Sequence, residues 1–175
     1  AQNEPLIFRN LNEMVDKSAD EVERSVLHSM LGELYLQYYQ KGQWAINQRT
    51  DLGDFVPGDM KQWTRNIFYN KVTEHLNASI AKEEELVGSK VESYAAVVEL
   101  GKDSRRFYPS MYDFLARRAV EIFRQIASEE DLSRTLTRKN ISLQSLFAPA
   151  EEYVALSFNP QPSEYKLGTL ETYRK

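Results

Sequence analysis

Residues 18–42, SADEVERSVLHSMLGELYLQYYQKG, decide the fold of this chain. Their apolar side chains recur at every third or fourth position, which is the spacing of a helix with a buried side. These residues are Val22, Val26, Leu27, Met30, Leu31, Leu34, Tyr35 and Tyr38. Ser18 and Glu21 have the spacing of a capping box, and Gly42 is typical of a helix end. The stretch predicts one long helix that begins after Ser18 and stops at Gly42.

The same spacing predicts further helices on either side of this one. They cover residues 5–17, 60–87, 91–100 and 111–126. Asp59, Ser89 and Ser110 stand where N-terminal caps are expected, and Gly88 stands where the second long helix would end. Residues 43–48 are expected to add one turn around Trp44, and residues 50–58 to form a loop. Residues 102–109 are expected to form a basic turn.

Beyond residue 127 the apolar spacing is weaker, with short helices predicted at residues 150–156 and 163–174. No run of alternating apolar and polar residues predicts a strand. The prediction is therefore an all-α protein of antiparallel helical hairpins, arranged as a tetratricopeptide-like array or as an irregular bundle. Residues 1–175 are expected to be a single domain, with a core at 5–127 and a further helical segment at 128–175.

Composition excludes several classes of function. The chain of 175 residues is 42% hydrophobic and 27% charged, which is typical of a folded domain. Its net charge of -4 argues against general binding to nucleic acids, because such binding depends on many Lys and Arg contacts with phosphates. No apolar stretch approaches the roughly 20 residues that cross a bilayer. The absence of cysteine excludes disulfides, thiolate metal sites and a cysteine nucleophile.

The sequence contains no recognisable catalytic, cofactor-binding or metal-binding motif. His28 and His75 are the only histidines, and neither has a partner at metal-ligand spacing, so helix packing is the favoured interpretation. The acidic runs at 83–85 and 129–131 are interpreted as solvated surface, because consecutive helical residues point about 100° apart. The chain is therefore predicted not to be an enzyme and to need no cofactor or metal.

Aromatic and basic residues provide the candidates for an interaction surface, because aromatic and Arg side chains dominate interface energetics. The candidates are Tyr38, Tyr39, Trp44, Arg49, Arg105, Arg106 and Tyr108. Alternative interpretations stay open for each of them. One of the adjacent tyrosines can be an ordinary exposed side chain, and the arginines can balance nearby acids.

Two stretches resemble known families. The segment LGELY at 31–35 is similar to the Leu-Gly-x-x-Tyr pattern of a tetratricopeptide repeat, although no second copy recurs 34 residues later. A longer resemblance covers about residues 22–123 through three blocks. These blocks are VLHSMLGELYLQYYQKGQW, DFVPGDMKQWT and YPSMYDFLARRAVEIF. Their order and spacing resemble the helical N-terminal region of the alpha-2-macroglobulin-like proteins of Bacteroidetes.

The longer resemblance implies a periplasmic or cell-envelope protein whose other domains trap proteases. The thioester that some members carry lies far downstream in a Cys-x-Glu-Gln motif, and this chain has no cysteine. We therefore expect a non-catalytic scaffold or interaction domain that contacts other domains of its polypeptide or an envelope protein. The alternatives are a stand-alone peptide-binding module, with a groove lined by residues such as Tyr39, Asn47 and Arg49, and an enzyme built around His28 and His75.

Overall fold

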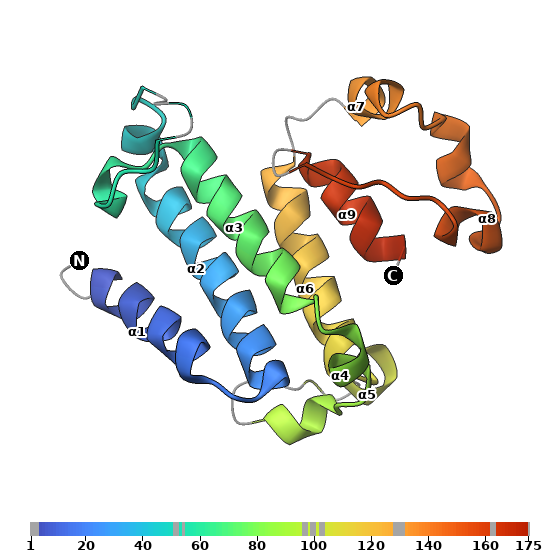
Figure 1. The fold of residues 1–175 in the computed structure, drawn as a ribbon, viewed down its shortest axis with the longest axis horizontal. Coiled ribbons are helices and arrows are strands. Elements are labelled where there is room, and N and C mark those ends of the chain that lie inside the picture. The colour runs from blue at the N-terminus through green and yellow to red at the C-terminus, as the bar shows by residue number, and fades with distance from the viewer. Residues whose placement is uncertain are drawn as a thin grey trace. The chain divides into compact units, whose positions relative to one another are not determined.

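The computed structural model describes residues 4–50, 53, 55–95, 98, 101, 104–127, 132–161 and 164–174, without the side chains of residues 4, 5, 104 and 105. Every regular element in these ranges is helical, which confirms the predicted all-α class (Figure 1). The chain divides into two compact units, Ala1–Leu115 and Ala116–Lys175, and the division falls inside one helix. The single-domain assignment stays a prediction, because two units that share a helix can belong to one domain.

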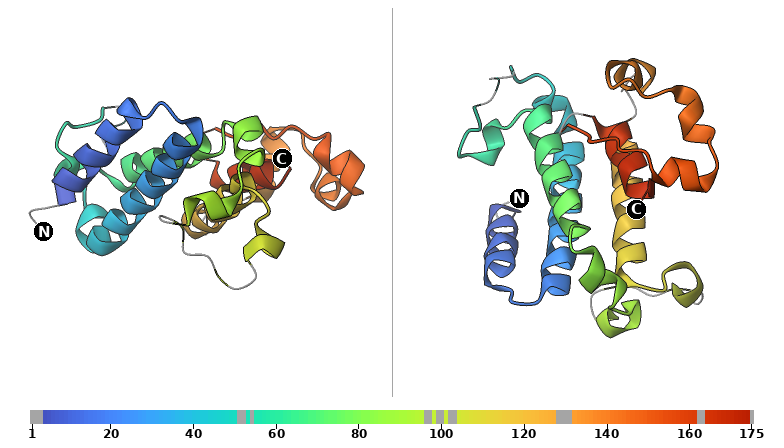
Figure 2. Two further views of the ribbon diagram at one scale, coloured as in Figure 1. Left: turned by 90° about the horizontal axis from the view of Figure 1, so that it is seen from below. Right: turned by 45° about the vertical axis from the view of Figure 1, so that its right-hand side comes forward.

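The first unit is built around an antiparallel hairpin. Helix α1 (Glu4–Lys17) packs on α2 (Glu21–Ile46), and α2 packs on α3 (Arg65–Ser79), as the two views in Figure 2 also show. Because α2 lies between α1 and α3, it buries residues on more than one side, including Leu31, Leu36 and Tyr39. Its apolar residues therefore extend around the helix instead of forming a single stripe.

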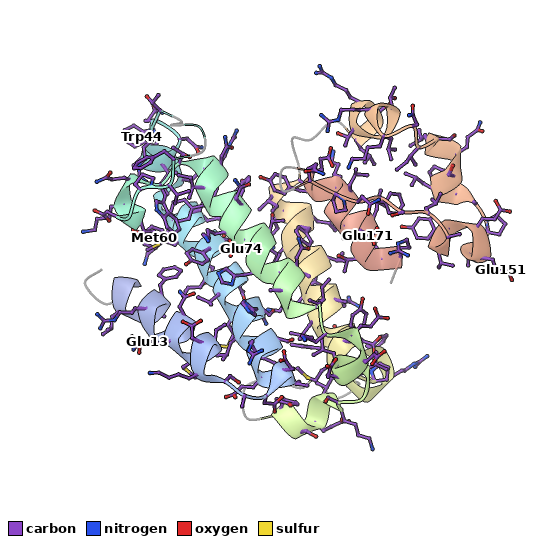
Figure 3. The ribbon with its side chains drawn as sticks, viewed as in Figure 1. Glu13, Trp44, Met60, Glu74, Glu151 and Glu171 are labelled. Carbon is purple, nitrogen blue, oxygen red and sulfur yellow. The ribbon has the colours of Figure 1, made fainter. Side chains whose placement is uncertain are left out.

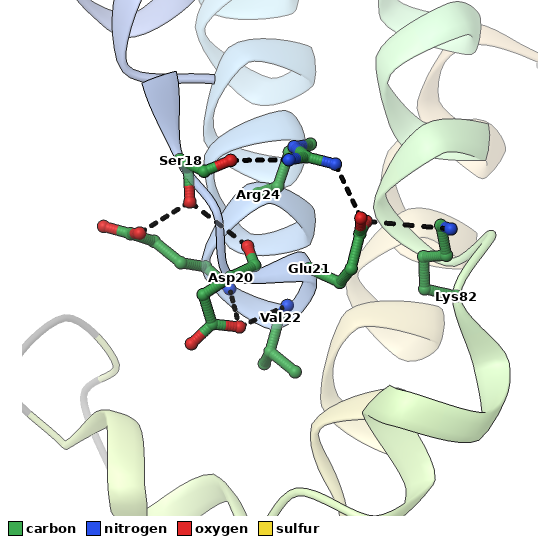
Figure 4. A network of polar contacts seen from close by, with 7 residues as sticks. Ser18, Asp20, Glu21, Val22, Arg24 and Lys82 are labelled. Atoms are coloured by element: carbon green, nitrogen blue, oxygen red, sulfur yellow. Dashed lines mark hydrogen bonds and ion pairs between the residues drawn. The ribbon is translucent and has the colours of Figure 1, made fainter. Parts of the chain in front are cut away.

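The N-terminus of α2 is capped by a different residue from the one predicted. The Asp20 carboxylate accepts hydrogen bonds from the backbone N–H groups of Val22 and Glu23, so Asp20 is the cap and the predicted box of Ser18 and Glu21 is wrong (Figure 4). The Ser18 hydroxyl instead lies 2.6 Å from a carboxylate oxygen of Glu23. Aspartate suits this N-cap position because its short side chain reaches the first unpaired backbone N–H groups. Its negative charge also interacts favourably with the positive end of the helix dipole.

The helix also continues past its predicted stop. Gly42 lies inside α2, which ends only at Ile46. The Ile46 side chain is 2% exposed, so its burial favours one further turn over the termination that glycine alone would suggest. Residues 43–46 of the predicted turn are thus part of the same helix, and residues 47 and 48 follow it as a turn.

The predicted helix at 60–87 is three elements in the structure. They are the 3-10 helix η1 (Met60–Gln62), α3 and α4 (Glu83–Val87). Asp59 caps η1 as predicted. At the end of α3 the buried Ser79 hydroxyl donates to the Leu76 carbonyl. Such a side-chain bond competes with the backbone hydrogen bonds that would continue the helix. Gly88 follows α4, as predicted.

Two shorter elements lie between α4 and α6 in the described residues. The 3-10 helix η2 (Val91–Tyr94) has Lys90 at its cap position without a side-chain bond, so the predicted cap at Ser89 is wrong. The predicted basic turn contains a short helix, α5 (Ser104–Phe107). Ser110 and Asp113 form a reciprocal cap at the start of α6 (Met111–Ile126), as predicted. The rest of the predicted helix at 91–100 falls partly outside the described residues.

The second unit has a small core of its own, formed by Leu136, Phe158 and Leu167. Its elements after α6 are α7 (Leu132–Arg138), η3 (Leu143–Phe147), α8 (Ala150–Val154) and α9 (Tyr165–Arg174). The last two confirm the short helices predicted at 150–156 and 163–174. Gly168 lies in the middle of α9, and a Cβ atom there would meet the Phe123 ring at ordinary van der Waals distance, 3.7 Å.

Among the described helices of both units, none is long and apolar enough to cross a membrane.

Candidate functional site

Three residues that the sequence grouped as a possible groove come together at one end of the α2–α3 hairpin. Asn47 and Arg49 follow the last turn of α2, and Tyr39 lies two turns earlier on the same helix. The Tyr39 hydroxyl donates to Oδ1 of Asn47 over 3.1 Å. Arg49 donates from Nη1 to the Trp63 carbonyl over 2.5 Å, which ties the end of α2 to the segment that leads into α3.

These contacts border a pocket of about 270 Å³ between the end of α2 and the start of α3. Six described residues line the pocket: Ile46, Asn47, Arg49, Thr64, Arg65 and Asn66. Two of them are arginines, two are asparagines, and none of the six is acidic. The described lining is therefore positively charged and rich in hydrogen-bond donors.

Thr64 gives the pocket a buried hydroxyl group. The residue is 4% exposed and holds the N-cap position of α3, but its side chain makes no capping hydrogen bond. Its Oγ1 atom has no hydrogen-bond partner among the residues that the structure describes. A buried hydroxyl without a partner is costly, so this atom is a local source of instability at the start of α3.

The same end of the hairpin exposes large apolar side chains. Trp44, in the last turns of α2, is 81% exposed, and Figure 3 shows it beside the loop that follows. Phe55 and Val56 in that loop are 64% and 51% exposed. We call these three residues the hairpin-end patch. Tryptophan is usually largely buried in folded chains, so its exposure makes Trp44 a candidate contact residue.

The remaining predicted surface residues lie elsewhere or are not on the surface. Tyr39 is 3% exposed, so it supports the pocket from inside and cannot itself bind a partner. Tyr38 is half-buried and stacks on Phe68 with ring centres 5.5 Å apart. Tyr39 is thus buried in the core and Tyr38 lies at the edge of the core, whereas the sequence suggested that at least one of the two is an ordinary exposed side chain.

The predicted basic cluster lies at the opposite end of the hairpin, near α5. Arg106 is exposed, and its guanidinium carbon is 6.0 Å from the centre of the Phe107 ring. Tyr108 is half-buried, edge-on to Phe114. The side chain of Arg105 lies outside the described residues. The seven predicted residues therefore do not form a single surface.

The two histidines form a pair that the sequence did not predict. The Nδ1 atoms of His28 on α2 and His75 on α3 are 2.9 Å apart, so one ring donates and the other accepts. His75 is 6% exposed, and its ring stacks on Tyr35 at 5.5 Å. The pair links the two helices of the hairpin across 47 residues of sequence. Predicting the His28–His75 contact requires the antiparallel register of α2 and α3. The spacing of residues within each helix does not define that register.

Burial keeps this pair uncharged near neutral pH. Burial lowers the pKa of His75 to about 4, with the charge of His28 acting in the same direction and Glu74 opposing both. Burial also lowers the pKa of His28, where Glu74 opposes the shift and Arg24 adds to it. Two neutral rings that share a hydrogen bond stabilise the helix interface, and we therefore assign the pair to packing between α2 and α3.

Other candidate groups give no assembled site within the described part of the chain. Nowhere in it do three His, Asp or Glu side chains come together as metal ligands. Glu83, Glu84 and Glu85 are exposed on α4, as the sequence indicated, and the acidic run at 129–131 lies outside the described residues. Comparisons with protein-family models, curated proteins and solved structures found no match for this chain.

Proposed function

We propose that this chain is a non-catalytic helical interaction domain that binds its partner through the end of the α2–α3 hairpin. The observation that carries the proposal is the 81% exposure of Trp44 in the last turns of α2. Tryptophan is among the residues that contribute most to binding when an interface covers them. The exposed Phe55 and Val56 enlarge the apolar area that a partner could cover.

The partner that we propose is another domain of the same polypeptide or a protein of the cell envelope. The three sequence blocks within residues 22–123 support a parent of the alpha-2-macroglobulin-like kind, in the periplasm or cell envelope. In that case the protease-trapping activity belongs to the parent protein, and this domain contributes a scaffold.

The size and location of the native polypeptide test the proposed parent. An antibody raised against this domain would detect the native protein in fractionated source cells. We expect an envelope band several times heavier than the 20.3 kDa of this chain. A soluble band at 20.3 kDa would instead reject the macroglobulin-like parent.

The docking surface is tested by one pair of variants. Trp44→Ala should weaken association with the remainder of the native polypeptide, supplied as a separate chain, by about 2 kcal/mol or more. Phe107→Ala is the matched control, because Phe107 is also a large exposed aromatic residue but lies at the opposite end of the hairpin. Equal effects of the two substitutions would argue against the hairpin-end patch as the docking surface.

A stand-alone peptide-binding module is the second candidate, because Asn47 and Arg49 line the pocket and Tyr39 holds Asn47 through a hydrogen bond. Tyr39→Phe tests it more cleanly than alanine would, since Tyr39 is buried and alanine would leave a cavity. The phenylalanine variant removes only the hydroxyl that orients Asn47. A short peptide that binds this variant and Arg49→Gln as it binds the unmodified chain would reject the module.

A further inference from the structure

The hydrogen bond between His28 and His75 depends on how many protons the two rings carry. In the neutral pair, one Nδ1 atom carries a hydrogen and donates it to the lone pair of the other. A first added proton can bind to the Nε2 atom of the donor ring and leave this bond intact. A second proton must bind to the acceptor Nδ1 atom, which places two N–H groups and two positive charges face to face. Full protonation of the pair therefore breaks the bond.

The surroundings of the pair oppose protonation while α2 and α3 stay packed. The charged groups that act on the two rings are Arg24 on α2 and Lys71 and Glu74 on α3. Burial is the largest cause of the lowered pKa of each histidine. Arg24 lowers the pKa of His28 further and Lys71 that of His75, whereas Glu74 raises both. Because the packed pair binds protons less readily than two separated rings, acid favours separation of the rings.

A continuous set of contacts leads from the pair to the loop of the hairpin-end patch. His75 stacks on Tyr35 with ring centres 5.5 Å apart, and Tyr35 stacks on Trp63 at 5.8 Å. The Trp63 indole N–H donates to the Pro57 carbonyl over 2.7 Å. Pro57 is buried directly after the two exposed loop residues of the patch. Three direct contacts therefore connect His75 to the backbone that carries the patch.

The histidines are the groups in this set of rings whose charge acid changes. Tyr35 also packs on Phe8 of α1, with ring centres 4.6 Å apart. Burial raises the pKa of Tyr35, and a hydrogen bond with the uncharged Asn12 of α1 opposes that shift. Tyr35 is therefore neutral throughout the acidic range, and neither Trp63 nor Phe8 can be protonated there.

We propose that the His28–His75 pair is a pH switch, whose full protonation separates α3 from α2 at this point and releases the partner bound at the hairpin-end patch. The inference rests on the proposed interaction function. When the two charged rings separate, Tyr35 and Trp63 lose their stacking contacts, and the loop is no longer held in one shape. None of the three patch residues titrates, so acid acts on partner binding through the pair.

Exchange of the two tryptophan indole N–H groups with solvent, measured by NMR on the full chain from pH 7 to about pH 4, tests the switch. The Trp63 group is hydrogen-bonded, whereas Trp44 is 81% exposed and serves as an internal reference. The ratio of the Trp63 rate to the Trp44 rate should rise about tenfold or more between pH 6 and pH 4. Helical circular dichroism should persist. The double substitution His28→Gln/His75→Gln should keep the ratio constant.

Two surface variants test the electrostatics without changing the core. Lys71 and Glu74 form an ion pair at 2.7 Å, with side chains 32% and 61% exposed. Lys71→Gln should shift the rise of the ratio to higher pH by about 0.3–1 unit, and Glu74→Gln should shift it to lower pH by a similar amount. Arg124→Gln is the matched control, because it removes an exposed positive charge on α6. It should cause no shift.

Three outcomes would overturn the switch. The first is a ratio that stays constant in the unmodified chain. The second is a shift in the same direction, or no shift, in the Lys71→Gln and Glu74→Gln variants. The third is loss of helical circular dichroism in the same pH step, because the exchange would then report unfolding of the whole chain.

The switch and the interaction function can fail separately. Affinity for the remainder of the native polypeptide, supplied as a separate chain, should fall about tenfold or more between pH 6 and pH 4, but not in His28→Gln/His75→Gln. If Trp44→Ala weakens association at pH 7 but the double variant loses affinity in acid as the unmodified chain does, the docking surface stands and the switch is rejected. If the indole ratio changes as expected but Trp44→Ala has no effect, the docking surface is rejected, and with it the release of a partner from that surface.

Discussion

At the scale of single residues, the His28–His75 pair has the clearest consequence for stability. The pKa of His75 is lowered to about 4 from an ordinary value of 6.5, mainly by burial. Between these pH values the unfolded chain binds a proton that the folded chain does not bind. The free energy of unfolding should therefore decrease as the pH falls through this range.

The expected loss from His75 is at most about 3 kcal/mol between pH 6.5 and pH 4. Urea unfolding at a series of pH values measures it. The double substitution His28→Gln/His75→Gln should flatten the plot of unfolding free energy against pH above pH 5. Glu164 changes stability only at lower pH, because its pKa is lowered. Burial acts to raise that pKa, but hydrogen bonds from Gln161, Lys139 and Arg138 outweigh burial. An unchanged slope above pH 5 in the double variant would contradict this role of the pair.

Leu31 and Leu34 have the same residue type but different environments. Leu31 is fully buried, whereas Leu34 is partly exposed. Leu31→Ala should therefore lower the free energy of unfolding by about 2–5 kcal/mol, and Leu34→Ala by clearly less. The sequence analysis placed both residues on the buried side of the helix, because helical spacing alone does not separate the centre of a buried face from its edge. Equal denaturant midpoints for the two variants would show that the buried face of α2 is misassigned.

At the scale of elements, residue spacing predicted which segments are helical better than it predicted where each helix ends. Gly42 was predicted to end α2, but the burial of Ile46 extends the helix past it. The break between α3 and α4 was not predicted, because it depends on a side-chain bond from Ser79 within the helix. The first error concerns burial that exists only in the packed structure, and the second concerns a local side-chain bond that the spacing of apolar residues does not reveal.

The close packing of α2 and α3 depends on Gly32. A Cβ atom at this position would lie 3.0 Å from Cδ2 of Leu76, which is fully buried on α3. Gly32→Val should therefore lower the free energy of unfolding by about 1–3 kcal/mol, in spite of the low helix propensity of glycine. Thermal unfolding monitored by circular dichroism would measure the change.

A double-mutant cycle separates this contact from general helix effects. Leu76→Ala removes the atoms that the added valine would meet, so the double variant should be more stable than the sum of the single changes indicates. Additivity of the two substitutions to within about 0.5 kcal/mol would contradict a direct contact between positions 32 and 76.

At the scale of the whole molecule, the sequence indicated the candidate site only in part. Asn47, Arg49 and Tyr39 were grouped as a possible groove. Asn47 and Arg49 line the pocket, whereas Tyr39 is buried and reaches it only through its hydrogen bond to Asn47. Thr64 was not identified, because its unpartnered hydroxyl follows from the three-dimensional position of α3 and has no counterpart in residue spacing. The sequence around the end of α2 could indicate Asn47 and Arg49. The residues on the other side of the pocket belong to the start of α3, and no sequence pattern connects them with α2.

The division into two compact units leads to a prediction about how the molecule unfolds. Phe158 is fully buried in the small core of the second unit, with Leu136 and Leu167. Phe158→Ala should destabilise that unit by about 3–5 kcal/mol. Hydrogen exchange should then show a larger loss of amide protection in α9 than in α2 and α3, because contacts lie mainly within each unit.

Leu31→Ala is the matched substitution in the first unit, since Leu31 is equally buried there. It should produce the reverse pattern, with α2 and α3 losing more protection than α9. If both variants lowered protection equally in all of these helices, the chain would unfold as one cooperative body. The boundary at residue 115 would then describe the distribution of contacts without separating two units of stability.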